Sequence, residues 1–335
     1  MSVHPHYQLC DAIAIEPVMH VLSESISQLF PLPEPSCVGT LDTGNSLVRI
    51  TLDPEPGIEV LAADFAAVSA MGVERFPTRV GSELVYASRR LLYRFDGQAM
   101  VSYILASIRE TIHAFDVLDP RDHRYFATLR PSSIVEQPLR LLLFDIVGEK
   151  LEFIADHSCT TSSRFATHSQ GLLIADGRAI TAFGRDLQPQ GHPLERLLAE
   201  LPWADTSSRI DALLLDPDRS SAYMIERTQQ DSQLWLLDWS VPEQPRCACL
   251  VQAPLIYRLA MSPDNRWLML RCREQDESIY VLPATPSEQQ VPLRLLTAAE
   301  AGPVTSSVWT DGVVSVAGCA QNLIYHWPIP GEALV

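Results

Sequence analysis

The carboxylates of this chain are its first candidates for chemistry. Asp42-Thr43-Gly44 has the composition of a proton-sharing aspartate site. Such a site needs two carboxylates at one proton, and therefore a second triplet or a homodimer of small domains. The sequence contains no second Asp-Thr-Gly, so we interpret this triplet as a turn. Asp145 or Glu226 could serve as an acid or a base only if the fold brought a partner group to it.

Metal ligands and nucleophiles give weaker signals. The nine histidines are scattered and form no HExxH motif; they are His4, His6, His20, His113, His123, His157, His168, His192 and His326. Seven cysteines without a CxxC pair are typical of reduced thiols in a cytoplasm. Cys247 and Cys249 alternate on an expected strand and are interpreted as buried apolar residues, since two thiols do not complete a zinc site. The nucleophile motif GxSxG, the P-loop and the dinucleotide motif GxGxxG are missing. We therefore predict no catalytic residue, no metal and no cofactor.

Composition narrows the range of partners. The chain has 335 residues with 25 basic and 41 acidic side chains, a net charge of −16. Such a field repels nucleic acid and anionic membrane surfaces. No apolar run reaches the length of a membrane span, and the N-terminus lacks a basic, apolar leader pattern. Arginine outnumbers lysine 24 to one, which indicates GC-rich coding. We expect a cytoplasmic bacterial protein.

Similar turns recur along the chain and predict its architecture. Asp119, Asp216 and Ser262 each precede a proline, and Thr310-Asp311-Gly312 resembles them. Such residues favour tight turns, because proline presets φ and a short polar side chain bonds to nearby backbone. The last three turns start 46 and 48 residues apart, and Asp119 precedes Asp216 by 97, about two units. Turns near residues 42, 81 and 169 complete a series of seven.

Each turn lies between short apolar segments typical of strands. The sixth unit predicts strands at 256–261, 266–272, 279–282 and 292–296, and the fifth and seventh units repeat this pattern. The last unit lacks its fourth strand, while Tyr7–Ile15 is a spare strand at the N-terminus. Four-stranded units of this length predict an all-β fold, a seven-bladed β-propeller in one domain, 1–335. We expect Tyr7–Ile15 to complete the last blade and close the ring. Leucines at helical spacing predict a short helix at 193–201.

The sixth unit, Ile256–Leu282, resembles the WD-repeat-like β-propeller superfamily in its strand, Ser-Pro-Asp turn, strand, loop and strand. Phe95-Asp96, Phe144-Asp145 and Trp327-Pro328 stand where that family has Trp-Asp. No unit contains Trp-Asp or opens with Gly-His, so the family's hydrogen-bond tetrad is not carried over. The resemblance implies a fold and names no partner.

The register of the repeat singles out a set of arginines. Counting eleven residues from each turn start reaches Arg130, Arg227, Arg273 and Gln321. Arg89 or Arg90, and Arg178, occupy the same point in the less regular units, the end of the second strand. We expect these side chains to form a partial basic ring, opposite an acidic end made by Asp119, Asp122, Asp216, Asp218, Asp264 and Asp311. The alternative is that the acids of the same loops neutralise the arginines in weak surface pairs; they are Glu226, Asp231, Glu274, Asp276 and Glu277.

These features favour a non-enzymatic interaction scaffold, a propeller subunit of a bacterial multi-protein system of defence, toxin–immunity or ATPase-associated type. Its partner would be a protein with an acidic or phosphorylated segment, because guanidinium groups bind both carboxylate and phosphate. Trp203, in a loop beside Pro202, is a further candidate contact residue. The alternatives are a metal-dependent propeller hydrolase or lactonase with a central-channel site, and a small-ligand sensor.

Overall fold

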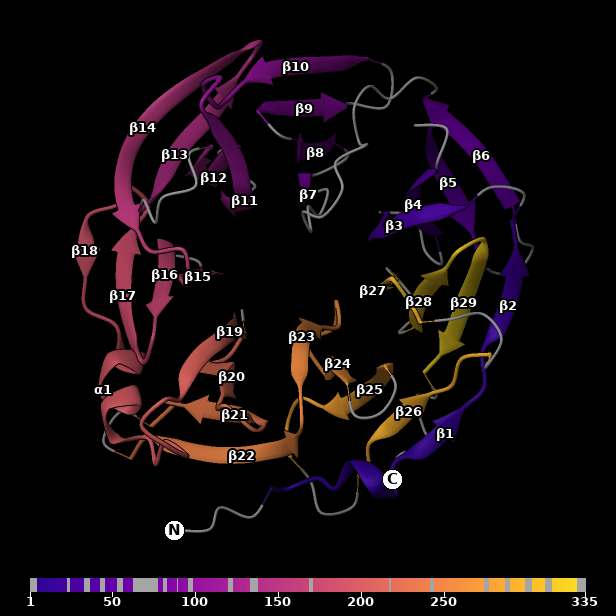
Figure 1. The fold of residues 1–335 in the computed structure, drawn as a ribbon, viewed down its shortest axis with the longest axis vertical. Coiled ribbons are helices and arrows are strands. Elements are labelled where there is room, and N and C mark those ends of the chain that lie inside the picture. The colour runs from indigo at the N-terminus through magenta and orange to yellow at the C-terminus, as the bar shows by residue number, and fades with distance from the viewer. Residues whose placement is uncertain are drawn as a thin grey trace. The chain divides into compact units, whose positions relative to one another are not determined.

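The described residues of the computed structural model form seven β-sheets and one α-helix (Figure 1). The described ranges are 5–22, 25–32, 37–42, 46–52, 57–62, 78–80, 83–88, 90–95, 99–119, 123–132, 138–168, 171–216, 218–241, 244–273, 277–286, 290–298, 303–310 and 315–329. The chain divides into two compact units, Met1–Ala66 with Arg196–Val335, and Ala67–Glu195. The all-β prediction is confirmed.

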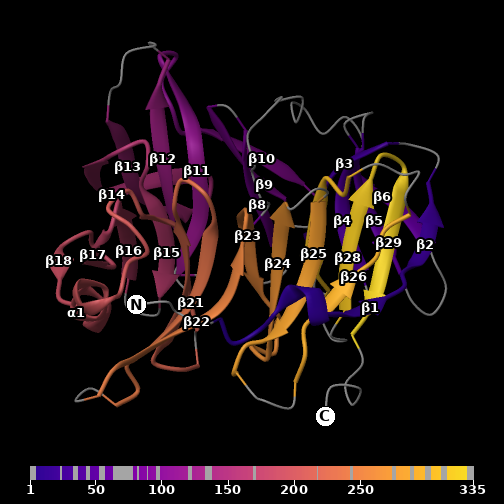
Figure 2. The same cartoon turned by 60° about the horizontal axis from the view of Figure 1, so that its bottom comes forward.

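The first unit contains four sheets, each built on antiparallel strands that follow one another in the sequence, and two of them gain a further strand from the N-terminal segment. One sheet is β19 (Arg209–Leu215), β20 (Ser221–Arg227), β21 (Ser232–Asp238) and β22 (Arg246–Ala253). The next is β23 (Ile256–Met261), β24 (Trp267–Arg273), β25 (Glu277–Pro283) and β26 (Leu293–Leu295). The third is β27 (Ser306–Trp309), β28 (Ser315–Ala320) and β29 (Leu323–Pro328), and the fourth is β3 (Ile26–Pro31), β4 (Cys37–Asp42), β5 (Leu47–Thr51) and β6 (Gly57–Ala62). The first strands β19, β23, β27 and β3 are successive neighbours within this unit (Figure 1). Figure 2 shows β23, β24 and β25 side by side in one sheet.

Three hairpin turns of this unit share one geometry, as the repeat predicts. The amide of Asp216 donates to the Ser221 carbonyl at 3.0 Å, that of Ser262 to Trp267 at 2.9 Å, and that of Thr310 to Ser315 at 3.0 Å. Each of these three turns joins the first strand of a sheet to the second. Asp42 differs, because it ends β4 and precedes β5, which are the second and third strands of their sheet. Residues 43–45, 81–82 and 169–170 of the other predicted turns lie outside the described residues.

The side chains in these turns carry out the structural role expected of them. The Asp216 carboxylate accepts the Asp218 amide at 3.0 Å, and Asp264 accepts the Arg266 amide at 3.2 Å. The Ser262 hydroxyl accepts the Trp267 amide at 2.9 Å. Thr310 and Ser315 share a hydroxyl contact, and His326 Nε2 lies 2.9 Å from the Ser315 hydroxyl. Buried short polar residues thus fix the hairpins from within.

The N-terminal segment follows the outer strands of three sheets, and the predicted pairing of Tyr7–Ile15 is wrong. The amide of Tyr7 donates to Leu250 at the edge of β22. Next, β1 (Ile13–Ile15) pairs in parallel with β26. The fourth strand of the last sheet is β2 (Val18–Val21), antiparallel to β29. The N-terminus therefore completes that sheet with a segment further along the chain, because β1 already occupies the free edge of the preceding sheet.

Three second strands of the first unit are almost continuously buried. Along β20 and β24 every residue except the last is buried, and along β28 all are. Cores form where neighbouring sheets face each other, as where Ile225 and Leu234 of one sheet pack with Leu268 and Leu270 of the next. Trp235, Trp267 and Trp327 are buried in these layers, as expected. Continuous burial explains why these strands lack a polar alternation.

The second unit contains three antiparallel sheets. They are β7 (Thr78–Val80), β8 (Glu83–Ser88), β9 (Leu91–Phe95) and β10 (Met100–Ile104); then β11 (Glu110–Asp119), β12 (Arg124–Pro131), β13 (Leu139–Val147) and β14 (Lys150–Cys159); then β15 (Arg164–His168), β16 (Gly171–Asp176), β17 (Ala179–Gly184) and β18 (Pro189–Gln190). Its cores resemble those of the first unit in being shared by consecutive sheets.

The predicted helix is α1 (Pro193–Glu200), which follows β18. Its leucine stripe is buried, with Leu194, Leu197 and Leu198 each less than 5% exposed. The stripe therefore packs within the protein and presents no apolar face. A helix of this length cannot span a membrane, and no other helix among the described residues is long and apolar enough to do so.

Candidate functional site

The first-unit arginines predicted from the repeat lie at the ends of second strands, where neighbouring sheets meet. Arg227 ends β20, and its guanidinium donates to the Ile256 carbonyl at 2.8 Å, at the start of β23 in the next sheet. The same group pairs with Asp211 of β19 at 2.5 Å. Asp211 is the extra residue of a β-bulge in β19, which directs its side chain toward Arg227. Arg227 therefore joins two sheets, and only 19% of its side chain is exposed.

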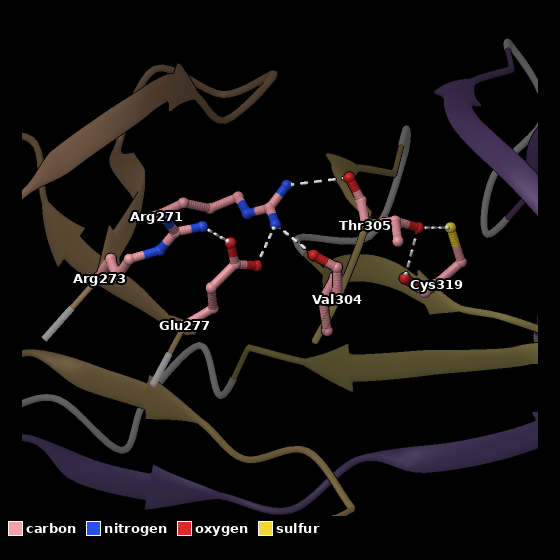
Figure 3. A network of polar contacts seen from close by, with 6 residues as sticks. All are labelled: Arg271, Arg273, Glu277, Val304, Thr305 and Cys319. Carbon is pink, nitrogen blue, oxygen red and sulfur yellow. Dashed lines mark hydrogen bonds and ion pairs between the residues drawn. The ribbon is translucent and has the colours of Figure 1, made fainter. Parts of the chain in front are cut away.

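A second arginine, which the register does not select, makes the equivalent link one sheet further. Arg271 of β24 donates to the carbonyls of Val304 and Thr305, just before β27 (Figure 3). It also donates to Glu277 Oε2 at 3.0 Å, and its guanidinium lies 5.1 Å from the centre of the Tyr257 ring. Only 6% of the side chain is exposed. A buried guanidinium needs such partners, because desolvation otherwise outweighs its attraction to a single carboxylate.

The position of Gln321 forms a third link of this kind. The Gln321 carbonyl accepts the amide of Ile26, at the start of β3, at 2.8 Å. Ile256 and Ile26 are the first residues of their first strands, and Val304 lies two residues before the first strand β27. The same kind of link therefore occurs three times in the first unit: a residue near the end of the second strand of one sheet binds the start of the first strand of the next sheet. The repeat brings these positions together for structural reasons.

Glu277 is shared by two arginines, as Figure 3 shows. Arg273, the last residue of β24, donates to Glu277 Oε1 at 2.9 Å. Burial by itself would raise the pKa of Glu277, but hydrogen bonds and charge from Arg273 and Arg271 outweigh it and lower this pKa below 4.5. Burial raises the pKa of the Tyr257 hydroxyl beside them. Glu277 is therefore held as a carboxylate and the cluster carries two cations for one anion among the described residues.

Arg273 differs from Arg227 and Arg271 in its exposure. Its side chain is 59% exposed, whereas Glu277 is 19% exposed. Its guanidinium is positioned by the half-buried Glu277, which Arg271 fixes in turn. This makes Arg273 the member of the cluster that can contact an external carboxylate or phosphate.

The remaining predicted arginines belong to the second unit. Arg130 is exposed near the end of β12, and Arg178 is half-buried in the turn between β16 and β17. Arg90 is exposed between β8 and β9, where its carbonyl accepts the amides of Leu105 and Ala106. Arg89 lies outside the described residues. All described members therefore occupy the predicted junction of second and third strands in their own sheets.

The other residues singled out by sequence are engaged by the protein itself. Glu226 is fully buried and accepts the Ala204 amide and Trp235 Nε1, each at 2.8 Å. The half-buried Trp203 donates through Nε1 to the Leu198 carbonyl at 3.1 Å, near the end of α1. Asp145 forms a bidentate pair with Arg124, with both distances 2.8 Å. None of these contacts joins two side chains that could act together as a catalytic acid and a catalytic base.

The paired cysteines behave differently from each other. Cys249 is buried, and burial together with Glu226 raises the pKa of its thiol to about 12. Cys247 is exposed, which corrects the expectation that both are core residues. The two cysteines alternate along β22 and so lie on the same side of it, with Cys247 nearer the beginning of the strand. Among the described residues no group of three His, Cys, Asp or Glu side chains is placed to hold a metal ion.

Sequence reasoning missed Arg271, Tyr257 and Asp211. Arg271 carries a detectable signal, because it is a charged residue inside the apolar strand Trp267–Cys272 with an acid six residues later. The residues at the β-bulges carry no such signal in the sequence. In four first strands the bulge directly follows an isoleucine, and this isoleucine cannot be told from other core residues by its type. These isoleucines are Ile26, Ile112, Ile210 and Ile256.

A scan against protein-family models and a search of curated proteins give no match to this chain. The resemblance to WD-repeat-like propellers therefore rests on the turns and strands quoted above.

Proposed function

We propose that this chain is a non-enzymatic interaction scaffold that presents Arg273 to an acidic or phosphorylated segment of another protein. The observation that carries the proposal is the sharing of one carboxylate, Glu277, by Arg271 and Arg273. At this end of the sheet the described residues leave one positive charge in excess, on a side chain that is 59% exposed. In a protein with a net charge of −16, such a point attracts a complementary anionic group locally.

The rigidity of the support favours binding. Glu277, itself bound by Arg271, positions the guanidinium of Arg273, so that less side-chain entropy is lost on association. Arg130 occupies the corresponding position in its own sheet and is exposed. We assign it the same role. Arg227 and Gln321 instead make hydrogen bonds that join neighbouring sheets.

The proposal includes a closed seven-bladed propeller as the scaffold. The seven sheets, the shared hairpin geometry and the completion of one sheet by β2 support it. Closure would remove unpaired sheet edges and make one rigid platform for several loops. The setting we propose is a bacterial multi-protein assembly in the cytoplasm.

The test is partner capture by the tagged full-length chain in its native host. Arg273→Glu should lower recovery of the partner at least about tenfold, ~1.4 kcal/mol, while the protein remains folded with a melting temperature only slightly below that of wild type, because the lost pair with Glu277 is exposed on the Arg273 side. Arg246→Glu, an exposed arginine on β22, is the matched control and should have no effect. Phosphatase treatment of the lysate separates a phosphorylated partner from an acidic one. Equal recovery with Arg273→Glu and wild type would exclude this residue as the contact.

A further inference from the structure

A small pocket lies at the opposite ends of the strands that carry the arginine cluster. The hairpin turns that precede β20 and β24 place Arg219 and Arg266 beside a cavity of about 200 Å³. Its other lining residues are Trp267, Pro283, Thr285 and Gln290. All six belong to the first unit.

Hydrogen bonds within one sheet and between neighbouring sheets fix the walls of this pocket. The amide of Ala284, beside Pro283, donates to the Arg266 carbonyl at 2.8 Å, and the Tyr223 hydroxyl donates to the Ala284 carbonyl at 2.8 Å. Arg219 donates to the Thr285 hydroxyl. Asn265 donates to Asp218 at 2.6 Å and so links the two turns. The pocket is therefore preorganised before any ligand binds.

In the part of the chain that the structure describes, the polar lining of the pocket consists of two guanidinium groups, a hydroxyl and an amide, with no carboxylate. Asp216 and Asp264 approach Arg219 and Arg266 only at Nε, each at 3.8 Å. That distance is too long for a hydrogen bond. Among the described residues, no hydrogen bond engages the guanidinium of Arg266, whose side chain is 63% exposed. This end of the sheets therefore carries both acidic and basic side chains, whereas the sequence predicted an acidic end.

We propose that this pocket binds a compact oxyanion, a phosphate monoester or a carboxylate, on a small organic molecule. Converging donors require a ligand that accepts hydrogen bonds, and two cations favour an anion over a neutral acceptor. A planar guanidinium fork matches the oxygen spacing of both groups. Trp267 and Pro283 provide an apolar wall for the carbon part of the ligand. The volume admits one anionic group and a few further atoms.

Calorimetric titration of the full chain tests this assignment. The probes are phenyl phosphate, benzoate and the neutral benzyl alcohol. At least one of the two anions should bind, more weakly as salt is added, and the alcohol should not bind. The stronger of the two anions identifies the preferred group. Arg266→Gln should weaken binding at least about tenfold with an unchanged melting curve, because no hydrogen bond in the described residues depends on its guanidinium. Arg246→Gln should bind like wild type.

The assignment is overturned if neither anion binds at roughly 10 mM, well above the millimolar affinity range. It is also overturned if Arg266→Gln binds equally well, or if benzyl alcohol binds as tightly as the anions. The partner proposed for Arg273 is independent of these results, since the two sites lie at opposite ends of β24 and are probed by different variants.

Discussion

Replacement of Arg271 by methionine tests the most specific claim about this structure, that a buried arginine joins two sheets. Methionine keeps an unbranched side chain against Tyr257 but removes every donor. The Val304 carbonyl then loses its partner in a buried position, and the carbonyl of the exposed Thr305 loses a part-buried contact. Glu277 keeps its bond from Arg273, so no carboxylate is left without a cation.

The magnitude follows from these losses. A buried acceptor without a partner costs about 1–3 kcal/mol, and removal of one partner from a buried ion pair costs about 3–5 kcal/mol. Because Arg273 retains Glu277, we expect the lower part of that range, about 3 kcal/mol in the free energy of unfolding. Arg273→Met, at a site 59% exposed, should cost only about 0–1 kcal/mol.

Urea unfolding followed by tryptophan fluorescence measures both variants. Equal m-values would show that the same surface is exposed in each and that the midpoints can be compared. The reasoning is refuted if Arg271→Met loses less than about 1 kcal/mol, or no more than Arg273→Met. In that case the contacts to Val304 and Thr305 contribute little to stability.

Three further predictions concern stability. Asp216→Ala should reduce the free energy of unfolding by about 0.5–2 kcal/mol through loss of its bond to the Asp218 amide, and leave partner capture unchanged; selective loss of capture would contradict a structural role. Deletion of residues 1–22 should expose the edge of β29 and give insoluble or strongly destabilised protein, so a deletion variant that melts like the parent excludes this pairing. The lowered pKa of Glu277 stabilises the fold above about pH 5, and this contribution is lost as the pH falls through the lowered pKa. Glu277→Gln should therefore show a smaller drop in urea midpoint between about pH 5 and pH 3 than wild type does, and identical drops would argue against the pairing.

The sequence by itself determined the strands, the turns and the helix of the regular units. The expected segment 256–261 coincides with β23, and 193–201 differs from α1 by one residue. Such features are local: a short polar side chain at a turn bonds to backbone within a few residues, as Asp216 does with Asp218. The spacing of the leucines likewise predicts which face of α1 is buried, although it does not indicate which residues cover that face.

Only the tertiary structure decided which residues meet between sheets. Arg227 and Ile256 are 29 residues apart, and Arg271 and Val304 are 33 apart. Their pairing depends on how one sheet packs on the next and on bulges that no local pattern reveals. The pairing of the N-terminal segment is a similar case. Ile13–Ile15 and Val18–Val21 are both typical of strands, and their composition does not indicate which of them pairs with β26 and which with β29. The pocket beside Arg219 and Arg266 also depends on packing, since its walls come from turns and strand ends of two sheets.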